Sequence, residues 1–305
     1  MISKKTTKFL PIIFKKRRKQ RTWIEPFLWV SPALLIYLVF RLVPLFSSFY
    51  LSLFRWNGLD LPKFVWFQNF QRIFEDQQVG MALWHNIHYA FGTVIGKIVL
   101  SLLLALLLNN ALRGRTFYRT GLFLPVVISF VVVGILWTWM LDTRVGMINA
   151  LLRLLNLNMA TQDWLGDPKI AMWSLIIVDI WKWYGFHMVI FLAGLQTIPL
   201  ELYESAMIDG ASRWNQFWFI TLPMLRPVML INVTLSLMGA FNVFDIPFIM
   251  TEGGPANSTQ VMATLVYIRG FKFYNFGYAS ALSVILFVVV IIVSSIQMKL
   301  MNKKD

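Results

Sequence analysis

The sequence predicts an all-α integral membrane protein with six transmembrane helices. Of its 305 residues, 58% are hydrophobic and 14% are charged, a composition too apolar for a soluble domain. A helix needs roughly 20 apolar residues to cross the hydrocarbon core of a bilayer. Six stretches reach this length, at about 27–50, 84–108, 120–141, 170–194, 219–249 and 278–300. The fifth stretch is overlong, so we expect it to tilt or to be interrupted at Pro247.

Positive charge is concentrated at the N-terminus, where residues 1–22 form a basic tail in a chain of net charge +14. A basic tail beside an apolar span indicates membrane topology and contact with anionic lipids, so nucleic acid is not an expected partner. The apolar stretch that follows is too long for a signal peptide, and we expect it to remain as an anchor in a transmembrane domain of residues 23–305. The chain has no cysteine, which excludes disulfides and thiol chemistry. The basic residues of the tail are Lys4, Lys5, Lys8, Lys15, Lys16, Arg17, Arg18, Lys19 and Arg21.

The charges of the loops predict the orientation of the spans. Arg113, Arg115 and Arg119 follow the second span without an acidic residue, and the C-terminus holds Lys299, Lys303 and Lys304. The alternate loops mix acidic and basic residues. By the positive-inside rule, both termini and the loop after the second span are cytoplasmic, and so is the segment after the fourth span. Three loops then face outside, at about 56–83, 142–169 and 251–255. We expect a short helix at 147–155 in the second and a turn in the third.

The segment after the fourth span is polar and favours helix formation. Pro199, Glu201 and Glu204 suit the first turns of a helix, where the macrodipole favours negative charge. Gly210 is expected to end that helix in the left-handed conformation. Ser212 can cap a second helix that enters the fifth span, with Pro223 and Pro227 in its path. The sequence therefore predicts a helix, a glycine turn and a second helix protruding on the cytoplasmic side.

This segment resembles the EAA motif of binding-protein-dependent ABC importers. Glu204-Ser205-Ala206, three residues, Gly210, nine residues and Ile220-x-Leu222-Pro223 match the motif without a gap, with Ser205 in place of its usual first alanine. The resemblance implies that residues 198–211, here called the coupling segment, fit a cleft on a separate ATPase subunit. The coupling residues expected from it are Glu201, Glu204, Ser205, Ala206, Asp209, Gly210 and Ala211.

A second resemblance covers nearly everything from the first span to the C-terminus. Trp137-x-Trp139 with Gly146 and Asn149, Trp164–Pro168, Gly253-Gly254-Pro255 and Gly277-Tyr278-Ala279 look like the carbohydrate-uptake, maltose-permease-like members of these importers. It implies the type I ABC importer permease fold in a prokaryotic cytoplasmic (inner) membrane. The implied partners are a second, homologous permease in a heterodimer, two ATPase subunits that bind ATP and Mg, an external solute-binding protein and a carbohydrate. Oligosaccharides, glycosides, sugar alcohols and glycerol phosphates are carried by similar permeases. Glycerol phosphate would require cationic groups, which could also sit chiefly in the binding protein.

Charged and aromatic residues inside the fourth span suggest a solute site. Asp179, Lys182, Trp183 and Phe186 stand at i, i+3, i+4 and i+7, so they share one helical face. An ionisable residue at membrane depth needs a partner or a wet cavity. Carbohydrate recognition commonly combines an aromatic surface with carboxylate hydrogen bonds, which this face offers. Alternatively, Asp179 and Lys182 neutralise each other against the partner subunit.

The fifth span carries a stripe of small and polar residues. The stripe could permit close helix packing or leave room for a sugar, and the family resemblance favours the cavity. Its members are Asn232, Ser236, Gly239, Ala240 and Val243, with Asn242 and Asp245 as secondary candidates.

No catalytic constellation is apparent in the sequence, so we expect a transport subunit rather than an enzyme. His85, His88 and His187 lack a metal-ligand set, and we expect no metal or cofactor in this chain. The run from Gly92 to Lys97 echoes a phosphate loop, but its glycine spacing is one residue short and Ile98 stands where Ser or Thr is needed. The alternative function is an ion-gradient-driven secondary transporter or channel, in which charges within the spans would form an ion relay.

Overall fold

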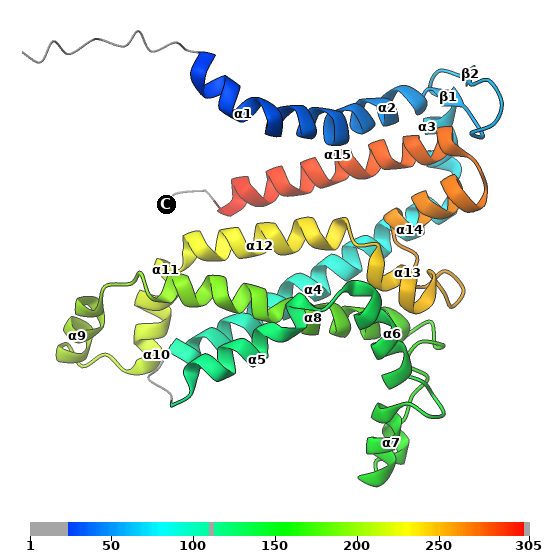
Figure 1. Cartoon of the computed structure of the whole chain (residues 1–305). Helices are drawn as coiled ribbons and strands as arrows, with labels where there is room; N and C mark the ends of the chain where they lie inside the picture. The colour runs from blue at the N-terminus through cyan, green and yellow to red at the C-terminus, as the bar shows by residue number, and fades with distance from the viewer. Residues whose placement is uncertain (1–23, 110–112, 302–305) are drawn as a thin grey trace, which may run out of the picture. The chain divides into compact units, whose positions relative to one another are not determined.

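The computed structural model describes residues 24–109 and 113–301 (Figure 1). The basic tail predicted at residues 1–22, together with Lys303 and Lys304, lies outside the described residues. The chain divides into two compact units, residues 1–47 and 48–305, and each is described by itself.

The described part of the first unit is helical throughout. It contains α1 (Ile24–Tyr37), a π-helical turn η1 (Leu38–Leu42) and the first residues of α2 (Val43–Leu51). The window Phe27–Leu51 has a mean hydropathy of 1.9, and none of the strongly apolar part of it is buried within the protein. An apolar helix whose side chains are mostly exposed is suited to contact lipid or another subunit.

Three further helices are long and apolar enough to cross a membrane, namely α4 (Gln77–Asn109), α8 (Ala171–Leu195) and α15 (Phe276–Met301). Two bent helix pairs bring the number of candidate spans among the described residues from four to six if each pair is one span. Four of the predicted stretches are therefore confirmed as long apolar helices, whereas the third and fifth are broken.

The third predicted stretch is broken near Ile128. Helix α5 (Arg115–Val127) and helix α6 (Phe130–Met140) meet at an angle of 96°. Ser129 begins α6, and its hydroxyl accepts a hydrogen bond from the Val132 amide at 3.4 Å. A serine N-cap favours a new helix start at this point.

The fifth predicted stretch is broken in two places, and neither break is at Pro247. The first is a 66° bend between α11 (Leu222–Met224) and α12 (Arg226–Phe241). The second lies between α12, which ends at Phe241, and α13 (Asp245–Thr251). Pro247 is the third residue of α13, where its missing amide N–H leaves no helical hydrogen bond unmade. The expected interruption at Pro247 was therefore wrong.

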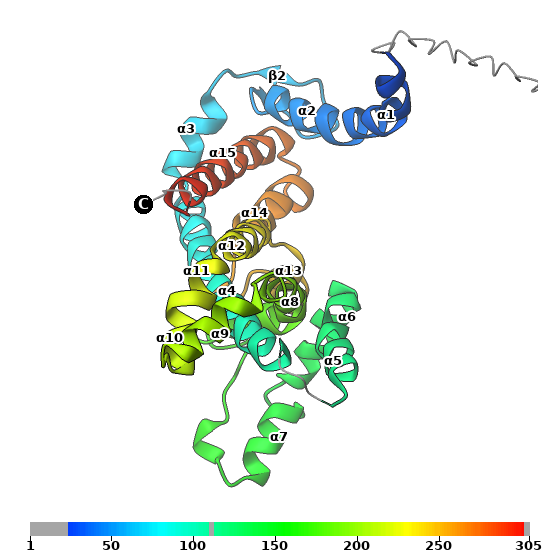
Figure 2. The ribbon, with the colours of Figure 1, turned by 90° about the vertical axis from the view of Figure 1, so that its left-hand side faces the viewer.

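The helices of the second unit pack around α8. Helix α4 lies along α8, and α5 and α12 also pack against α8 (Figures 1 and 2). Two buried clusters occupy this packing, one that includes Tyr89, Leu175 and Phe241 and another that includes Ala105, Phe191 and Leu225. Within this unit, α9 and α10 lie at one end of the helices, while α13 and α14 lie at the other end (Figure 1).

Short elements form the loops at the α13 end. Strands β1 (Phe54–Arg55) and β2 (Lys63–Phe64) pair in an antiparallel hairpin, followed by α3 (Gln68–Glu75). Helix α7 (Met147–Leu154) and the 3-10 turn η2 (Asn158–Ala160) confirm the short helix predicted at 147–155. The predicted turn after Thr251 is also present, with Glu252 and Gly253 at φ of 50° and 89°. Helix α14 (Met262–Tyr267) and the π-helical turn η4 (Ile268–Lys272) lead into α15.

Candidate functional site

The coupling segment folds as a short helix closed by a glycine. Helix α9 (Leu200–Ile208) ends at Gly210, whose φ of 76° is the left-handed conformation that glycine adopts most easily. The Ala211 amide donates to the Ala206 carbonyl at 2.8 Å, and the Gly210 amide donates to the Met207 carbonyl at 3.1 Å. These two bonds form a Schellman motif, which satisfies carbonyls that the helix end would otherwise leave free. The predicted helix end is therefore confirmed.

Side-chain hydrogen bonds cap the second helix and join α9 to the turn that follows it. The Ser212 hydroxyl accepts from the Asn215 amide at 3.3 Å and begins α10 (Arg213–Gln216), as predicted. The Tyr203 hydroxyl lies 2.9 Å from Thr221 Oγ1 in the following π-helical turn η3 (Phe217–Thr221). Because this bond joins α9, which precedes Gly210, to η3, which follows it, the coupling segment is held against the start of the fifth span.

The outward surface of the coupling segment is both acidic and apolar. Glu201, Glu204 and Asp209 are exposed, and none of them forms an ion pair with a described residue. Ile208 is 87% exposed, and Leu200 and Met207 of the same helix are 66% and 59% exposed. Ser205 and Gly210 are also exposed, whereas Ala206 and Ala211 are half-buried. Exposed apolar side chains rimmed by carboxylates are typical of a protein-binding surface.

A buried ion pair joins two long helices inside the bundle. Lys97 Nζ of α4 lies 2.5 Å from Asp179 Oδ2 of α8, and the two side chains are 3% and 5% exposed. The interpretation that Asp179 and Lys182 neutralise each other was therefore wrong. A charged group at this depth needs such a partner, because unpaired charges are costly in a low-dielectric surrounding.

Lys182 instead binds the broken end of α5. Its Nζ donates to the carbonyls of Pro125, Val126 and Ile128 at 2.9, 2.9 and 2.6 Å. A helix end leaves its last carbonyls without partners, and at membrane depth these must be satisfied by protein groups. The Lys182 ammonium satisfies these carbonyls at the 96° bend, so we expect the lysine to stabilise the bend.

A close backbone approach supports the same contact. An added Cβ at Gly185 would lie 2.2 Å from the Leu122 carbonyl oxygen of α5, so only glycine lets α5 lie this near to α8.

A cavity of about 440 Å³ opens between α8, α12 and the break that precedes α13. This volume lies within the range of roughly 300–1,000 Å³ typical of small-molecule sites. Eight predicted residues line it, namely Asp179, Trp183, Phe186, Ser236, Gly239, Val243, Asn242 and Asp245. The geometry therefore brings together most of the residues that the sequence singled out on the fourth and fifth spans.

Three predicted solute residues do not line this cavity. Lys182 is directed to the α5 carbonyls. The Asn232 side chain lies 2.8 Å from His187 Nδ1 and donates to the Val228 carbonyl at 3.3 Å. Ala240 is 1% exposed and belongs to the buried cluster around Tyr89. These three positions serve packing and internal hydrogen bonding in this structure.

Four further lining residues were not predicted as part of the site, namely Lys97, Phe130, His187 and Leu235. Lys97 carried a usable signal, since a lysine within an apolar span is a functional candidate by itself. Phe130 lies beside the cavity where α6 begins after the bend, and that bend was not predicted, although Ser129 is a favourable N-cap residue.

The aromatic side chains at the cavity form a connected group. The Phe130 and Trp183 ring centroids are 6.0 Å apart, and those of Trp183 and Phe186 are 5.8 Å apart. Lys182 Nζ lies 5.1 Å from the Phe130 centroid and 5.5 Å from that of Trp183. The Lys182 ammonium thus contacts both rings from outside the cavity while it donates to the α5 carbonyls. These contacts help to position the Phe130 and Trp183 rings.

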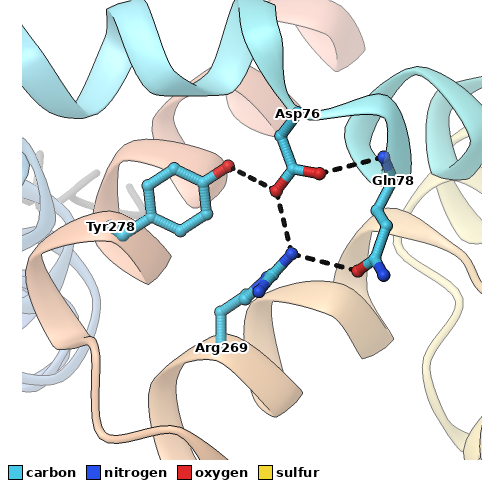
Figure 3. Close-up of polar contacts among 4 residues, drawn as sticks. All are labelled: Asp76, Gln78, Arg269 and Tyr278. Carbon is cyan, nitrogen blue, oxygen red and sulfur yellow. Dashed lines mark hydrogen bonds and ion pairs between the residues drawn. The ribbon is translucent and has the colours of Figure 1, made fainter.

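A second polar cluster lies at the α13 end and joins the segment before α4 to the start of α15 (Figure 3). Asp76 Oδ2 accepts from Arg269 at 2.9 Å and from the Tyr278 hydroxyl at 2.9 Å, while its other oxygen accepts from the Gln78 amide at 2.9 Å. Arg269 also donates to the Gln78 side chain at 3.0 Å. The Asp76 carboxylate therefore caps α4 and ties it to η4 and α15 at the same time.

The loop of α7 is organised around Asn149. Its side-chain amide donates to the carbonyls of Thr143 and Gln162, and its oxygen accepts from Trp164 Nε1 at 2.8 Å. Amide donors of Val145 and Arg144 lower the pKa of the exposed Asp142 carboxyl at the start of this loop. Asn149 and Trp164 carried part of the family resemblance, and here they hold the loop together.

These features define a polytopic helical membrane protein with a cavity lined by aromatic and charged side chains and a protruding helix–turn–helix. Residues 97–304 match the family described as binding-protein-dependent transport system inner membrane component, and the chain belongs to this family. The sequence is thus that of an ABC importer permease, as its EAA-like segment indicated.

Individual relatives cover almost the whole chain. It is 36% identical over 279 residues to the probable ABC transporter permease protein YurN of Bacillus subtilis, covering 90% of this chain and 95% of YurN. It is 33% identical over 278 residues to the arabinooligosaccharides transport system permease protein AraP of the same species, covering 90% of this chain and 88% of AraP.

The fold also matches solved structures. A bacterial ABC transporter involved in import of the acidic polysaccharide alginate superimposes with a TM-score of 0.79 at 23% identity, covering 92% of this chain and 98% of that chain. The same likeness holds for the alginate transporter solved with an alginate pentasaccharide-bound periplasmic protein, covering 93% of this chain and 98% of that one. At this identity, the likeness shows the ABC importer permease fold.

Proposed function

We propose that this chain is a membrane-spanning permease subunit that imports a sugar or related polyol, driven by ATP hydrolysis in separate ATPase subunits. The arrangement would be six spans with both termini in the cytoplasm of a prokaryotic cell, in the inner membrane. A second homologous permease would complete a heterodimer, and an external solute-binding protein would deliver the solute. The sugar relatives, such as AraP, support the solute class.

The observation that carries the coupling role is the coupling segment itself. It presents exposed carboxylates and an exposed Ile208 at the end of the second unit that is opposite α13 and α14. It is also fastened to the fifth span through Tyr203 and Thr221. A movement of a bound ATPase would therefore pass to the spans as a rigid displacement rather than be lost in a flexible loop. Glu204 and Asp209 would hold the ATPase by charge, and Gly210 would set the angle of the segment.

The transport cycle follows from two states of the same cavity. Closure of two ATP-bound ATPases would move the coupling segment and open the cavity outward, and ATP hydrolysis would return it inward. Alternating access requires that the two states be close in energy, so that each ligand can shift the balance. The solute would meet the Asp179 and Ser236 faces in the outward state.

Two variants test the coupling role in proteoliposomes that contain the whole transporter and its binding protein. Glu204→Lys reverses a charge on the coupling segment, and Gly210→Pro is incompatible with the positive φ at that position. We expect both to abolish uptake and solute-stimulated ATPase activity while membrane insertion is retained. Undiminished uptake in either variant would remove this assignment.

The solute role of the cavity is tested at Gly239. An added Cβ at Gly239 meets nothing within 4 Å, and the same is true of Gly121, which does not line the cavity. Gly239→Trp should therefore fill the cavity and weaken uptake, whereas Gly121→Trp should not. Equal losses in the two variants would point to an assembly defect instead.

The buried Lys97–Asp179 pair favours one alternative, an ion-gradient-driven secondary transporter in which the pair relays a proton. Uptake that follows a proton or sodium gradient without ATP would establish that alternative. The ATP-driven proposal expects no such dependence.

A further inference from the structure

The charges that face the cavity are unbalanced toward the negative. Its lining contains one ammonium, Lys97, and two carboxylates, Asp179 and Asp245. Lys97 and Asp179 neutralise each other at 2.5 Å and are both almost fully buried. Asp245 forms no ion pair with any residue in the described ranges. One carboxylate therefore remains uncompensated beside the cavity.

The other basic side chains near the cavity are already engaged. Lys182 gives its ammonium to three carbonyls of the α5 end and does not line the cavity. His187 lines it, but its Nδ1 lies 2.8 Å from Asn232 Oδ1. Among the described lining residues, no cation is thus free to bind an anionic solute group.

What the cavity does offer is neutral hydrogen-bonding capacity and aromatic surface. The Ser236 hydroxyl is buried, lines the cavity and has no hydrogen-bond partner among the described residues. A buried polar group without a partner costs free energy unless a ligand or water satisfies it. The rings of Phe130, Trp183 and Phe186 supply apolar area beside it. Hydroxyl groups and the C–H faces of a sugar ring match these two kinds of surface.

We infer that the cavity selects an uncharged polyhydroxy solute and rejects solutes that carry a carboxylate or a phosphate. This inference rests on the proposed solute role of the cavity and narrows the solute class within it. The fold alone does not determine the charge of the solute. The bacterial transporter involved in import of the acidic polysaccharide alginate shares this fold at 23% identity. The charge of the lining residues decides it here.

The size of the effect follows from Coulomb's law. At an effective dielectric constant of about 20 and a separation of about 10 Å, repulsion between one carboxylate and one anionic group weakens binding roughly tenfold. Removing the charge of Asp245 should relieve this repulsion and so raise the affinity for an anionic solute relative to that for an uncharged sugar.

The test uses the assembled transporter in lipid nanodiscs without its binding protein, so that the binding protein does not determine the choice of solute. Equilibrium binding is measured for a panel of neutral di- and oligosaccharides and for singly phosphorylated or carboxylated derivatives of those that bind, for example trehalose and trehalose 6-phosphate. The unaltered transporter should prefer the neutral member at least tenfold. Asp245→Asn should narrow that preference roughly tenfold, while Asp245→Glu should keep it.

A matched control removes a negative charge elsewhere. Asp60→Asn lies in the β1–β2 hairpin loop, outside the cavity, and should leave the preference unchanged. Equal binding of neutral and anionic members, or an unchanged preference in Asp245→Asn, would overturn the inference while the permease assignment stands. Binding of no neutral saccharide from the panel would instead contradict the proposed solute class and, with it, this inference.

Discussion

Replacing Lys97 by methionine should destabilise the assembled transporter more than any single change on the surface of the chain. Methionine keeps most of the apolar stem of lysine but removes the ammonium. Asp179 would then be left 5% exposed without the partner that now lies 2.5 Å away. The perturbation therefore isolates the buried charge and leaves side-chain volume nearly constant.

The magnitude follows from the burial of the pair. Removing one member of a buried ion pair costs about 3–5 kcal/mol, because the remaining charge stays desolvated. Replacing both members with apolar residues of similar size is often close to neutral. The double variant Lys97→Met/Asp179→Leu should therefore be more stable than Lys97→Met alone by about 3–5 kcal/mol.

The assay is the thermal denaturation of the purified transporter in detergent, with all four combinations measured at one scan rate. Lys97→Met should melt well below the unaltered protein, and the double variant should recover most of the loss. If Lys97→Met melts with the unaltered protein, or if the double variant is the less stable of the two, the ion pair does not stabilise the bundle and our reading of it fails.

Three further outcomes are expected from the geometry. Lys182→Met leaves three carbonyls at the α5 bend without their donor and should lower the rate of uptake strongly. Lys182→Arg should recover part of it. Unchanged uptake in Lys182→Met would mean that the bend does not depend on this lysine. Gly210→Ala meets no steric obstacle, but the alanine must keep a φ of 76°, which should cost about 1–2 kcal/mol locally. The variant should therefore reduce solute-stimulated ATPase activity, whereas Gly80→Ala should leave that activity unchanged. Arg269→Gln breaks a partly exposed ion pair with Asp76 and should cost only about 1 kcal/mol, seen as faster proteolysis of the loop before α4 with uptake retained.

Much of the candidate site could be predicted because helical periodicity and membrane depth constrain it together. Asp179, Trp183 and Phe186 share a helical face in any straight helix, and they do line one cavity. Gly210 and Ser212 marked helix boundaries through conformational and capping preferences that act locally. Because these preferences act within a few residues, such helix boundaries can be predicted from the local sequence alone.

The remainder depends on contacts between distant segments. Lys182 lies on the predicted face, but its long side chain reaches the α5 carbonyls. The Ser129 N-cap marks the bend that frees those carbonyls but does not indicate which side chain satisfies them. The partner of Asp179 lies on α4, more than 80 positions away, so spacing along one helix selected Lys182 wrongly. Pro247 misled for a different, local reason: a proline disrupts a helix interior but is tolerated in a first turn, and the start of α13 was not predicted.

Cross-linking at the coupling segment tests the central claim most directly. The chain contains no natural cysteine, so a single cysteine introduced at the exposed Ser205 gives an unambiguous label. The account predicts that Ser205→Cys cross-links to a copurifying ATPase subunit and reacts with a membrane-impermeant maleimide only after the cells are opened. Labelling from outside intact cells, or an assembled transporter in which this cysteine reaches no ATPase, would contradict it.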